Sequence, residues 1–557
     1  MKIWSRLFAL SAIILSFVCF GNAQSRTDVY AITGARIVTV SGAVIEKGTV
    51  VVRDGLIEAV GANATVPADA RVLDGTGLTV YPGFFDSLTS LGIAAPQAAQ
   101  TQRGPGGGGG GQQQQTQQPQ TNSNYPTGLQ PELSAFEQLK GGDTLFETAR
   151  NAGFTTALTV PRDGVFNGQS AVINLAGDSV SELVIKSPFA EHFSFRTIPG
   201  GYPASLMGTF SAFRQMLLDA QRLQELQKMY AANPRGMKRP EMDKSLEALF
   251  PILNGSMPII FNANLEREII RALDLAKEFK LNAIIAGGQE AWKVTDRLKA
   301  QNVPVLLSLN FPKRTAAVSP EADPEDMETL RFRAETPKGA ARLAAAGVKF
   351  AFQSGGLANL NDFFANAAKA TENGLAEDAA LRAMTLGAAQ ILGVDNRLGS
   401  IEAGKIANLT VVRGSILSKD KTITHVFVDG RLFEQKEKPK TPPTTGGGGG
   451  GGQTPAMAQV GGNYTITIEI PGQSLPGTLA LTQQGAILSG TLSTQMTGTS
   501  PIKDGKITSD GFSFSATVNY GGSQIEINVS GKVSGNSISG TLESPQGAIP
   551  FSGTKNP

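Results

Sequence analysis

The chain has 557 residues, and its 49 Lys and Arg against 47 Asp and Glu give a formal net charge of +2. This balance gives no reason to expect nucleic acid as the main partner. A single Cys excludes an internal disulfide framework and any site with several cysteine ligands. The chain has only two His, which excludes a metal centre built on three or four imidazoles of one chain.

The N-terminus has the pattern of a secretory signal peptide over residues 1–23. Basic residues precede an apolar run at 7–20, and a stretch of small residues ends at Ala23. We therefore expect cleavage after Ala23, loss of Cys19 with the signal, and a secreted or periplasmic protein. An uncleaved anchor is the alternative. No later segment predicts a transmembrane helix.

Two low-complexity tracts divide the sequence. Residues 97–125 are rich in Gly and Gln and lack apolar periodicity, which predicts a disordered, solvated loop. Residues 437–459 are rich in Gly and Pro and predict an interdomain linker. Beyond the linker, residues 460–557 alternate short apolar patterns with Gly turns, and SGTL recurs at 489–492 and 539–542. This predicts a separate all-β domain of about eight strands, a small barrel or a sandwich.

The region between the signal and the linker changes pattern twice. Residues 28–80 predict short strands with a hairpin turn at Asp54-Gly55, and residues 396–436 return to strand character. Between them, amphipathic patterns such as that of 264–280 alternate with apolar runs expected to be buried parallel strands, at 282–286, 303–309 and 348–353. This alternation predicts an α/β fold, best fitted by a (β/α)8 barrel over 81–395, with a doubly wound sheet as the alternative.

Three segments occur in order along this region: ITGARIVTVSGAVIEKGTVVVRDGLIEAVG, VYPGFFDSLTSLG and GLAEDAALRAMTLGAAQILGVDNRLGSIEAGKIANLTVV. Together they resemble the amidohydrolase superfamily, specifically its imidazolonepropionase-like branch. The resemblance covers residues 28–436 and implies a TIM-like (β/α)8 barrel plus a composite β-sandwich made from 28–80 and 396–436. On the spacing of GTL and GTK, the last domain resembles calycin-like β-barrels appended to secreted bacterial hydrolases.

The resemblance also implies one or two divalent metals, which activate water and polarise the scissile carbonyl. The family pattern supplies HxH after the first barrel strand, two later His and a proton-shuttling Asp. Carried over to this sequence, these five ligand positions are occupied by Leu88, Ser90, Asn262, Gly287 and Gly355. None of them is a His or an Asp, so the family's metal ligands are missing at these positions.

Other polar residues could line the mouth of the barrel. The expected lining consists of Asp86, Asn264, Glu290 and Ser354. A cluster of Asp86, Glu290 and Asp362 with Lys293 could hold a hard cation such as Ca²⁺ or Mg²⁺. However, Asp86 fits a supporting role, and Glu290 fits a carboxylate at a helix start.

The two histidines offer no substitute ligands. His192 lies in the middle of the barrel region, and His425 lies in the returning β-segment. One imidazole without partners does not bind a catalytic metal tightly, so we expect both to be structural.

The sequence therefore favours a pseudoenzyme with no catalytic residue and no cofactor. It would be a non-catalytic binding or assembly subunit, acting beside an active amidohydrolase homologue, and an oligomer is compatible with this role. One alternative is an active hydrolase of non-peptide C–N bonds, such as those of cyclic amides, with a rebuilt site for Zn²⁺ or another divalent metal. Another is a binding protein whose 460–557 domain performs the main task.

Overall fold

The computed structural model describes residues 29–435 except 94–124, 127, 163, 199–200, 314–324 and 358, and residues 460–556 except short gaps at 471–472, 486, 495–497, 508–510, 521–522, 535–536 and 545–546. The expected signal peptide, the expected linker and the Gly/Gln tract except Tyr125 lie outside these residues. The chain divides into two compact units, Met1–Lys440 and Thr441–Pro557. No helix in the described ranges is long and apolar enough to cross a membrane.

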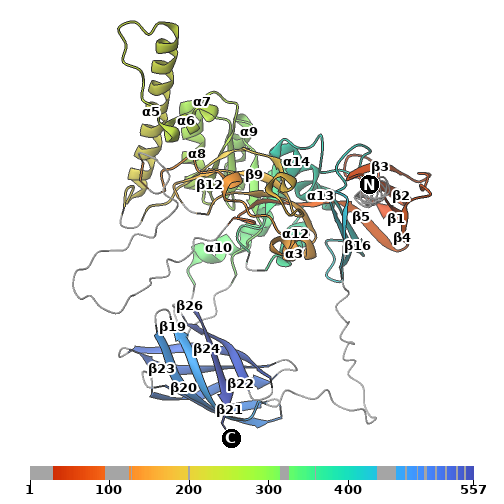
Figure 1. The fold of residues 1–557 in the computed structure, drawn as a ribbon, viewed down its shortest axis with the longest axis vertical. Coiled ribbons are helices and arrows are strands. Elements are labelled where there is room, and N and C mark those ends of the chain that lie inside the picture. The colour runs from red at the N-terminus through yellow and green to blue at the C-terminus, as the bar shows by residue number, and fades with distance from the viewer. Residues whose placement is uncertain are drawn as a thin grey trace, which may run out of the picture. The chain divides into compact units, whose positions relative to one another are not determined.

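An eight-stranded sheet unites the two ends of the first unit (Figure 1). Its strands are β1 (Tyr30–Ile37), β2 (Ile45–Arg53), β3 (Leu56–Gly61), β4 (Arg71–Asp74), β5 (Leu78–Pro82), β16 (Leu409–Arg413), β17 (Thr422–Val428) and β18 (Arg431–Glu434). The predicted turn at Asp54-Gly55 connects β2 to β3. Strand β5 pairs antiparallel with β16, so that Val80 lies opposite Val411. The segments expected to form a composite β-domain thus share one sheet.

The intervening chain forms two further sheets, ordered β10-β9-β7-β6 and β15-β14-β13-β12-β11-β8. Their strands are β6 (Phe84–Thr89), β7 (Phe154–Thr159), β8 (Phe166–Gln169), β9 (Ala171–Asn174), β10 (Val184–Lys186), β11 (Glu191–Ser194), β12 (Ile259–Ala263), β13 (Ala283–Gly287), β14 (Val305–Ser308) and β15 (Phe350–Gln353). Strands β11 to β15 pair in parallel. The three predicted buried parallel strands are β13, β14 and β15, and the mixed α/β class is confirmed.

The two sheets meet at both edges. Strands β8 and β9 are separated only by Ser170, whose backbone N donates to Ala190 O at 2.9 Å. At the other edges β6 lies against β15, where Ser354 N donates to Asp86 Oδ1 at 2.9 Å. The barrel strands therefore form a ring that surrounds an apolar interior, which includes Phe85, Ile260 and Leu306.

One segment of the ring differs from the parallel arrangement expected from the sequence. Strand β9 runs antiparallel to β7, and β8 runs antiparallel to β11. The reason is the short connection over 160–165, because a parallel return needs a crossover of about a dozen residues or more.

Helices cover the outside of the ring. They include α3 (Asp143–Asn151), α5 (Leu206–Ala232), α8 (Glu266–Phe279), α9 (Thr295–Ala300), α10 (Met327–Glu335), α11 (Gly339–Ala345), α12 (Asp362–Glu372), α13 (Glu377–Met384) and α14 (Leu386–Leu392), with single-turn helices α2 (Ala135–Gln138), α4 (Val180–Leu183), α6 (Lys244–Ala248) and α7 (Phe250–Leu253) and 3₁₀ turns η1 (Ala291–Lys293) and η2 (Thr336–Lys338). The predicted amphipathic helix over 264–280 corresponds to α8, which buries Ile269, Leu273 and Ala276. Between ring and helices, Phe193 and Phe213 pack edge to face at 4.5 Å between centroids.

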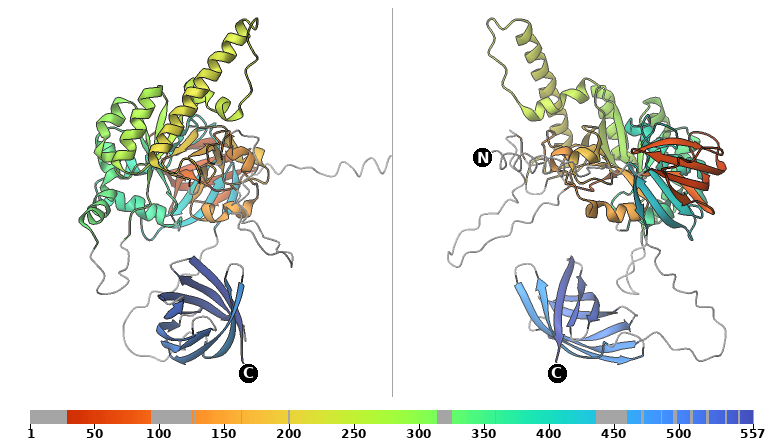
Figure 2. Two further views of the ribbon diagram at one scale, coloured as in Figure 1. Left: turned by 90° about the vertical axis from the view of Figure 1, so that its left-hand side faces the viewer. Right: turned by 45° about the vertical axis from the view of Figure 1, so that its right-hand side comes forward.

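The second unit is a closed antiparallel barrel, whose strands enclose one interior (Figure 2). Its strands are β19 (Gly462–Ile470), β20 (Gln473–Gln484), β21 (Ile487–Thr494), β22 (Gly498–Ile507), β23 (Phe512–Tyr520), β24 (Ser523–Ser534), β25 (Ser537–Ser544) and β26 (Gly547–Lys555). The predicted separate all-β domain is confirmed, and its interior is packed with side chains such as Tyr464, Phe514 and Phe551. The repeated SGTL lies in β21 and β25. Its glycines allow close strand contact, because a Cβ on Gly540 would lie 2.1 Å from Ser530 O.

A buried asparagine connects the composite sheet to the ring. Asn408 Nδ2 donates to Thr156 Oγ1 at 3.0 Å and to Asn174 Oδ1 at 2.7 Å. Its Oδ1 accepts from Asp429 N at 2.7 Å. Both polar ends of one amide are therefore satisfied inside the protein, where an unpaired group would be costly.

We predict that Asn408→Leu lowers the free energy of unfolding by about 2–4 kcal/mol, because its partners stay buried without hydrogen bonds. Chemical denaturation of the full chain measures this change. The control is Asn151→Leu, which alters an exposed asparagine at the end of α3 and should cost less than about 0.5 kcal/mol. Equal losses in the two variants would contradict the role given to Asn408.

Candidate functional site

A cavity of about 510 Å³, here called the mouth cavity, opens at the carboxyl ends of the ring strands. All five positions at which the resemblance places metal ligands line it, together with Asn264 and Ser354 from the expected lining. Further lining residues are Asn167, Ser194, Ser308 and Gln353, and the two arginines Arg162 and Arg196. The structure thus brings together residues from strands β6, β12, β13 and β15, although different side chains occupy the ligand positions.

Asp86 lies beneath the lining rather than in it. Its side chain is 1% exposed, and its Oδ1 accepts from Ser354 N at 2.9 Å and from Leu88 N at 3.4 Å. Burial raises the pKa of Asp86 to about 6. The carboxyl group therefore connects two strand ends, which is the supporting role that the sequence suggested.

Glu290 lies away from the mouth cavity, contrary to its expected place in the lining. It lines a separate groove of about 1280 Å³, where Glu266 N donates to its Oε2 at 2.8 Å. Its Oε1 accepts from Lys293 Nζ at 2.7 Å. The reason is local: the carboxylate satisfies the first amide of α8, as expected for a helix start.

The three carboxylates considered for a hard-cation site, Asp86, Glu290 and Asp362, do not come together. Asp362 pairs with Lys313 at 3.3 Å, whereas Glu290 pairs with Lys293. Across the described ranges, no group of three or more His, Cys, Asp or Glu could hold a metal ion.

Neither histidine lines the mouth cavity. His192 on β11 is fully buried, burial lowers its pKa to about 3, and neither ring nitrogen has a hydrogen-bond partner among the described residues. His425 on β17 lies in the composite sheet, where its Nδ1 lies 3.0 Å from Thr424 Oγ1. A nucleophile in the cavity, such as Ser90 or Ser354, thus has no histidine base beside it in the lining.

Hydrogen bonds between neutral groups organise the wall of the cavity. Asn262 Nδ2 donates to Ser194 Oγ at 2.8 Å, and Ser194 Oγ donates to Asn167 Oδ1 at 2.7 Å. Asn167 Nδ2 then reaches Arg162 O at 3.5 Å. Sequence reasoning had identified Asn262 alone of this series, which we call the amide relay.

Two glycines at ligand positions leave no space for a side chain. Gly287 has φ +94°, and a Cβ there would lie 2.4 Å from Asn264 Oδ1. Gly355 has φ +60°, and its Cβ would lie 2.0 Å from Ser308 Oγ. A His or an Asp at either position would therefore require its neighbour to move.

The residues of the mouth cavity do not fit a divalent metal. Zinc takes His, Cys or carboxylate ligands, whereas the described lining offers amides, hydroxyls and two guanidinium groups. Guanidinium groups repel a cation and cannot act as ligands, because they carry only donors. We therefore derive no reaction step through a metal at this site.

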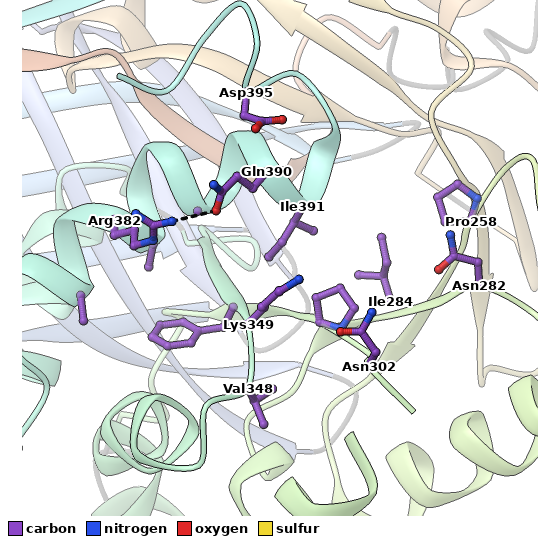
Figure 3. Close-up of a pocket in the computed structure, with 15 residues that line it drawn as sticks. Pro258, Asn282, Ile284, Asn302, Val348, Lys349, Arg382, Gln390, Ile391 and Asp395 are labelled. Atoms are coloured by element: carbon purple, nitrogen blue, oxygen red, sulfur yellow. Dashed lines mark hydrogen bonds between the residues drawn. The ribbon is translucent and has the colours of Figure 1, made fainter. Parts of the chain in front are cut away.

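A further cavity of about 630 Å³ lies at the opposite, amino ends of strands β12 to β15 (Figure 3). There Arg382 Nη2 donates to Gln390 Oε1 at 3.0 Å, and Lys349 borders the opening. Barrel enzymes place their chemistry at the carboxyl ends of the strands, so the mouth cavity is the better candidate.

Comparisons with known proteins agree with this fold. Residues 326–433 match the amidohydrolase family. The crystal structure of an amidohydrolase from Thermotoga maritima aligns with 73% of this chain and 100% of its own, at 25% identity and a TM-score of 0.60. No curated protein matches the sequence.

Two further solved structures are more distant. A Xaa-Pro dipeptidase with bound methionine is 15% identical over 73% of this chain and 100% of its own, with a TM-score of 0.42. An adenosine deaminase from Xanthomonas campestris with bound zinc is 17% identical over 72% of this chain and 92% of its own, with a TM-score of 0.41. The family match over residues 326–433 and the Thermotoga structure together show that the chain has an amidohydrolase fold. The imidazolonepropionase-like branch stays a prediction.

We predict that Gly355→Ala destabilises the protein more than Gly356→Ala. Both glycines have positive φ, +60° and +75°, but a Cβ on Gly356 would meet nothing within 4 Å. The shared backbone strain costs about 1 kcal/mol, and the contact with Ser308 adds to it only at Gly355. Unfolding free energies measure both. Adding Ser308→Ala should recover part of the Gly355→Ala loss, and no recovery would contradict the steric explanation.

We also predict a pH-dependent contribution from Asp86. Its pKa in the folded protein, about 6, exceeds the ordinary 3.8, so folding favours the protonated form. This stabilisation is present below about pH 4 and is lost as the pH rises through about 6. Relative to Asp86→Asn, the wild type should lose up to about 3 kcal/mol between pH 4 and pH 7. Denaturation of both proteins at each pH tests this, and a constant difference would refute it.

Proposed function

We propose that this protein is a non-catalytic binding or assembly subunit built on an amidohydrolase fold, in which the mouth cavity holds a ligand and does not hydrolyse it. The observation that carries the proposal is the mouth cavity itself. The five positions at which the resemblance places metal ligands hold Leu, Ser, Asn, Gly and Gly. Asn264 and Ser308 occupy the space that a side chain at the two glycines would need.

The chemistry of the lining supports binding. Metal-assisted hydrolysis requires ligands that hold a cation with an open position for water. The lining instead presents neutral hydrogen-bonding groups, several of which already satisfy one another through the amide relay. A preformed polar cavity of this volume suits a small molecule.

The finer features of the fold belong to the same proposal. The ring of β6 to β15 corresponds to a TIM-like (β/α)8 barrel in which the strand over 166–174 is reversed. The closed barrel of the second unit corresponds to a calycin-like domain. The N-terminal sequence supports export to the periplasm or the exterior, and an amidohydrolase homologue with intact ligands is the partner that we propose.

Metal analysis of the full chain tests the proposal. We expect far less than one Zn²⁺ or other transition metal per chain, and no hydrolysis of cyclic amides or dipeptides with or without added Zn²⁺. The matched control is an active amidohydrolase purified in the same way. One tightly bound metal per chain, together with hydrolysis that a chelator abolishes, would overturn the proposal and establish a rebuilt active site.

A further inference from the structure

The described lining of the mouth cavity contains arginines but no acidic side chain. Among the described residues that line it, Arg162 and Arg196 are the only ionisable side chains, and both are exposed. The carboxyl group of Asp86 lies beneath the lining and hydrogen-bonds to backbone amides. The described lining thus carries two formal positive charges and no negative charge.

The amide relay supports the backbone next to one of these arginines. Arg162 follows β7, and its carbonyl oxygen is the last acceptor of the relay that begins at Asn262 on β12 and passes through Ser194 on β11. Arg196 follows β11, two residues after Ser194, and its carbonyl oxygen accepts from Thr209 Oγ1 at 2.9 Å. Both arginines therefore extend from backbone that is held by hydrogen bonds.

The functional groups of the lining are complementary to an anion with a neutral body. A guanidinium group offers only donors, and its planar fork matches carboxylate and phosphate oxygens. The amides of Asn262 and Asn264 carry both donors and acceptors, which suit uncharged polar groups. A volume of about 510 Å³ accommodates a small organic molecule.

We propose that the mouth cavity binds a small ligand carrying an oxyanion, a carboxylate or a phosphate, which Arg162 and Arg196 hold while the amides contact its neutral part. This inference rests on the proposed function, because it assigns a ligand class to a cavity that binds and does not hydrolyse. In this proposal the two arginines are the binding residues.

Calorimetric titration of the full chain tests the ligand class. The probes are sodium succinate and inorganic phosphate at constant ionic strength, with succinamide as the uncharged match of succinate. We expect saturable binding of at least one anion and none of succinamide. Arg162→Gln and Arg196→Gln should each weaken anion binding about tenfold or more, because each removes a charge-assisted contact. Tighter binding of succinate indicates a carboxylate ligand, and tighter binding of phosphate indicates a phosphate ligand.

The matched control is Arg382→Gln, which removes an exposed arginine from the cavity at the amino ends of the strands and should keep wild-type affinity. Thermal melts show that each variant is folded. Absence of saturable binding by either anion, or wild-type affinity in the Arg162→Gln and Arg196→Gln double variant, would overturn the ligand class.

Metal content, read on the same samples, separates the two proposals. If the protein contains no metal and binds neither anion, the proposed ligand class is refuted, whereas the proposed non-catalytic function still stands. If the protein contains one metal per chain and a chelator abolishes its hydrolysis, the proposed non-catalytic function is refuted, whether or not the anions bind.

Discussion

A carboxyl group that water does not reach holds the ring at the point where its first and last strands meet. Asp86 extends from β6, and its Oδ1 accepts from Ser354 N directly after β15. The same oxygen lies 3.4 Å from Leu88 N, so it also holds the irregular end of β6, after which Ser90 follows in the lining of the mouth cavity. Because the lining comes from separate strand ends, its geometry depends on this connection between β6 and β15.

Hydrogen bonds between neutral groups organise the mouth cavity. Besides the amide relay, Ser308 Oγ accepts from Asn310 N at 3.1 Å, and Asn310 Nδ2 donates to Gly355 O at 3.2 Å. These bonds join the ends of β14 and β15 through neutral groups. In many metal sites the folded arrangement is maintained by the ion, so that removal of the ion loosens the site. Here the polar groups of the wall supply that order themselves.

The sequence predicted most of the elements because their patterns are local. Helix α8 and strands β13 to β15 show clear periodicity, and the eight strands of the second unit are separated by recognisable turns. Position-by-position resemblance also placed Leu88, Gly287 and Gly355 in one cavity. These predictions required only the order of motifs along the chain.

What could not be predicted depends on contacts between distant segments. The reversed strand over 166–174 follows from a connection too short for a crossover, and its apolar pattern is the same in either direction. Glu290 was expected at the mouth because its distance along the chain from β13 suggested it, but the start of α8 binds it. Arg162 and Arg196 were missed because exposed arginines after a strand are common in any sequence.

The composite sheet can form only late in the synthesis of the chain. Strand β5 has β16 as its antiparallel neighbour, and some 330 residues of sequence separate them. During synthesis from the N-terminus, the backbone N–H and C=O groups of β5 that face β16 have no hydrogen-bond partner in that strand until nearly the whole first unit has been synthesised. An unpaired strand edge is a template for association with other chains. A nascent chain of this protein is therefore most prone to aggregation just before residue 409 is synthesised, and this is the stage at which a chaperone would need to protect it.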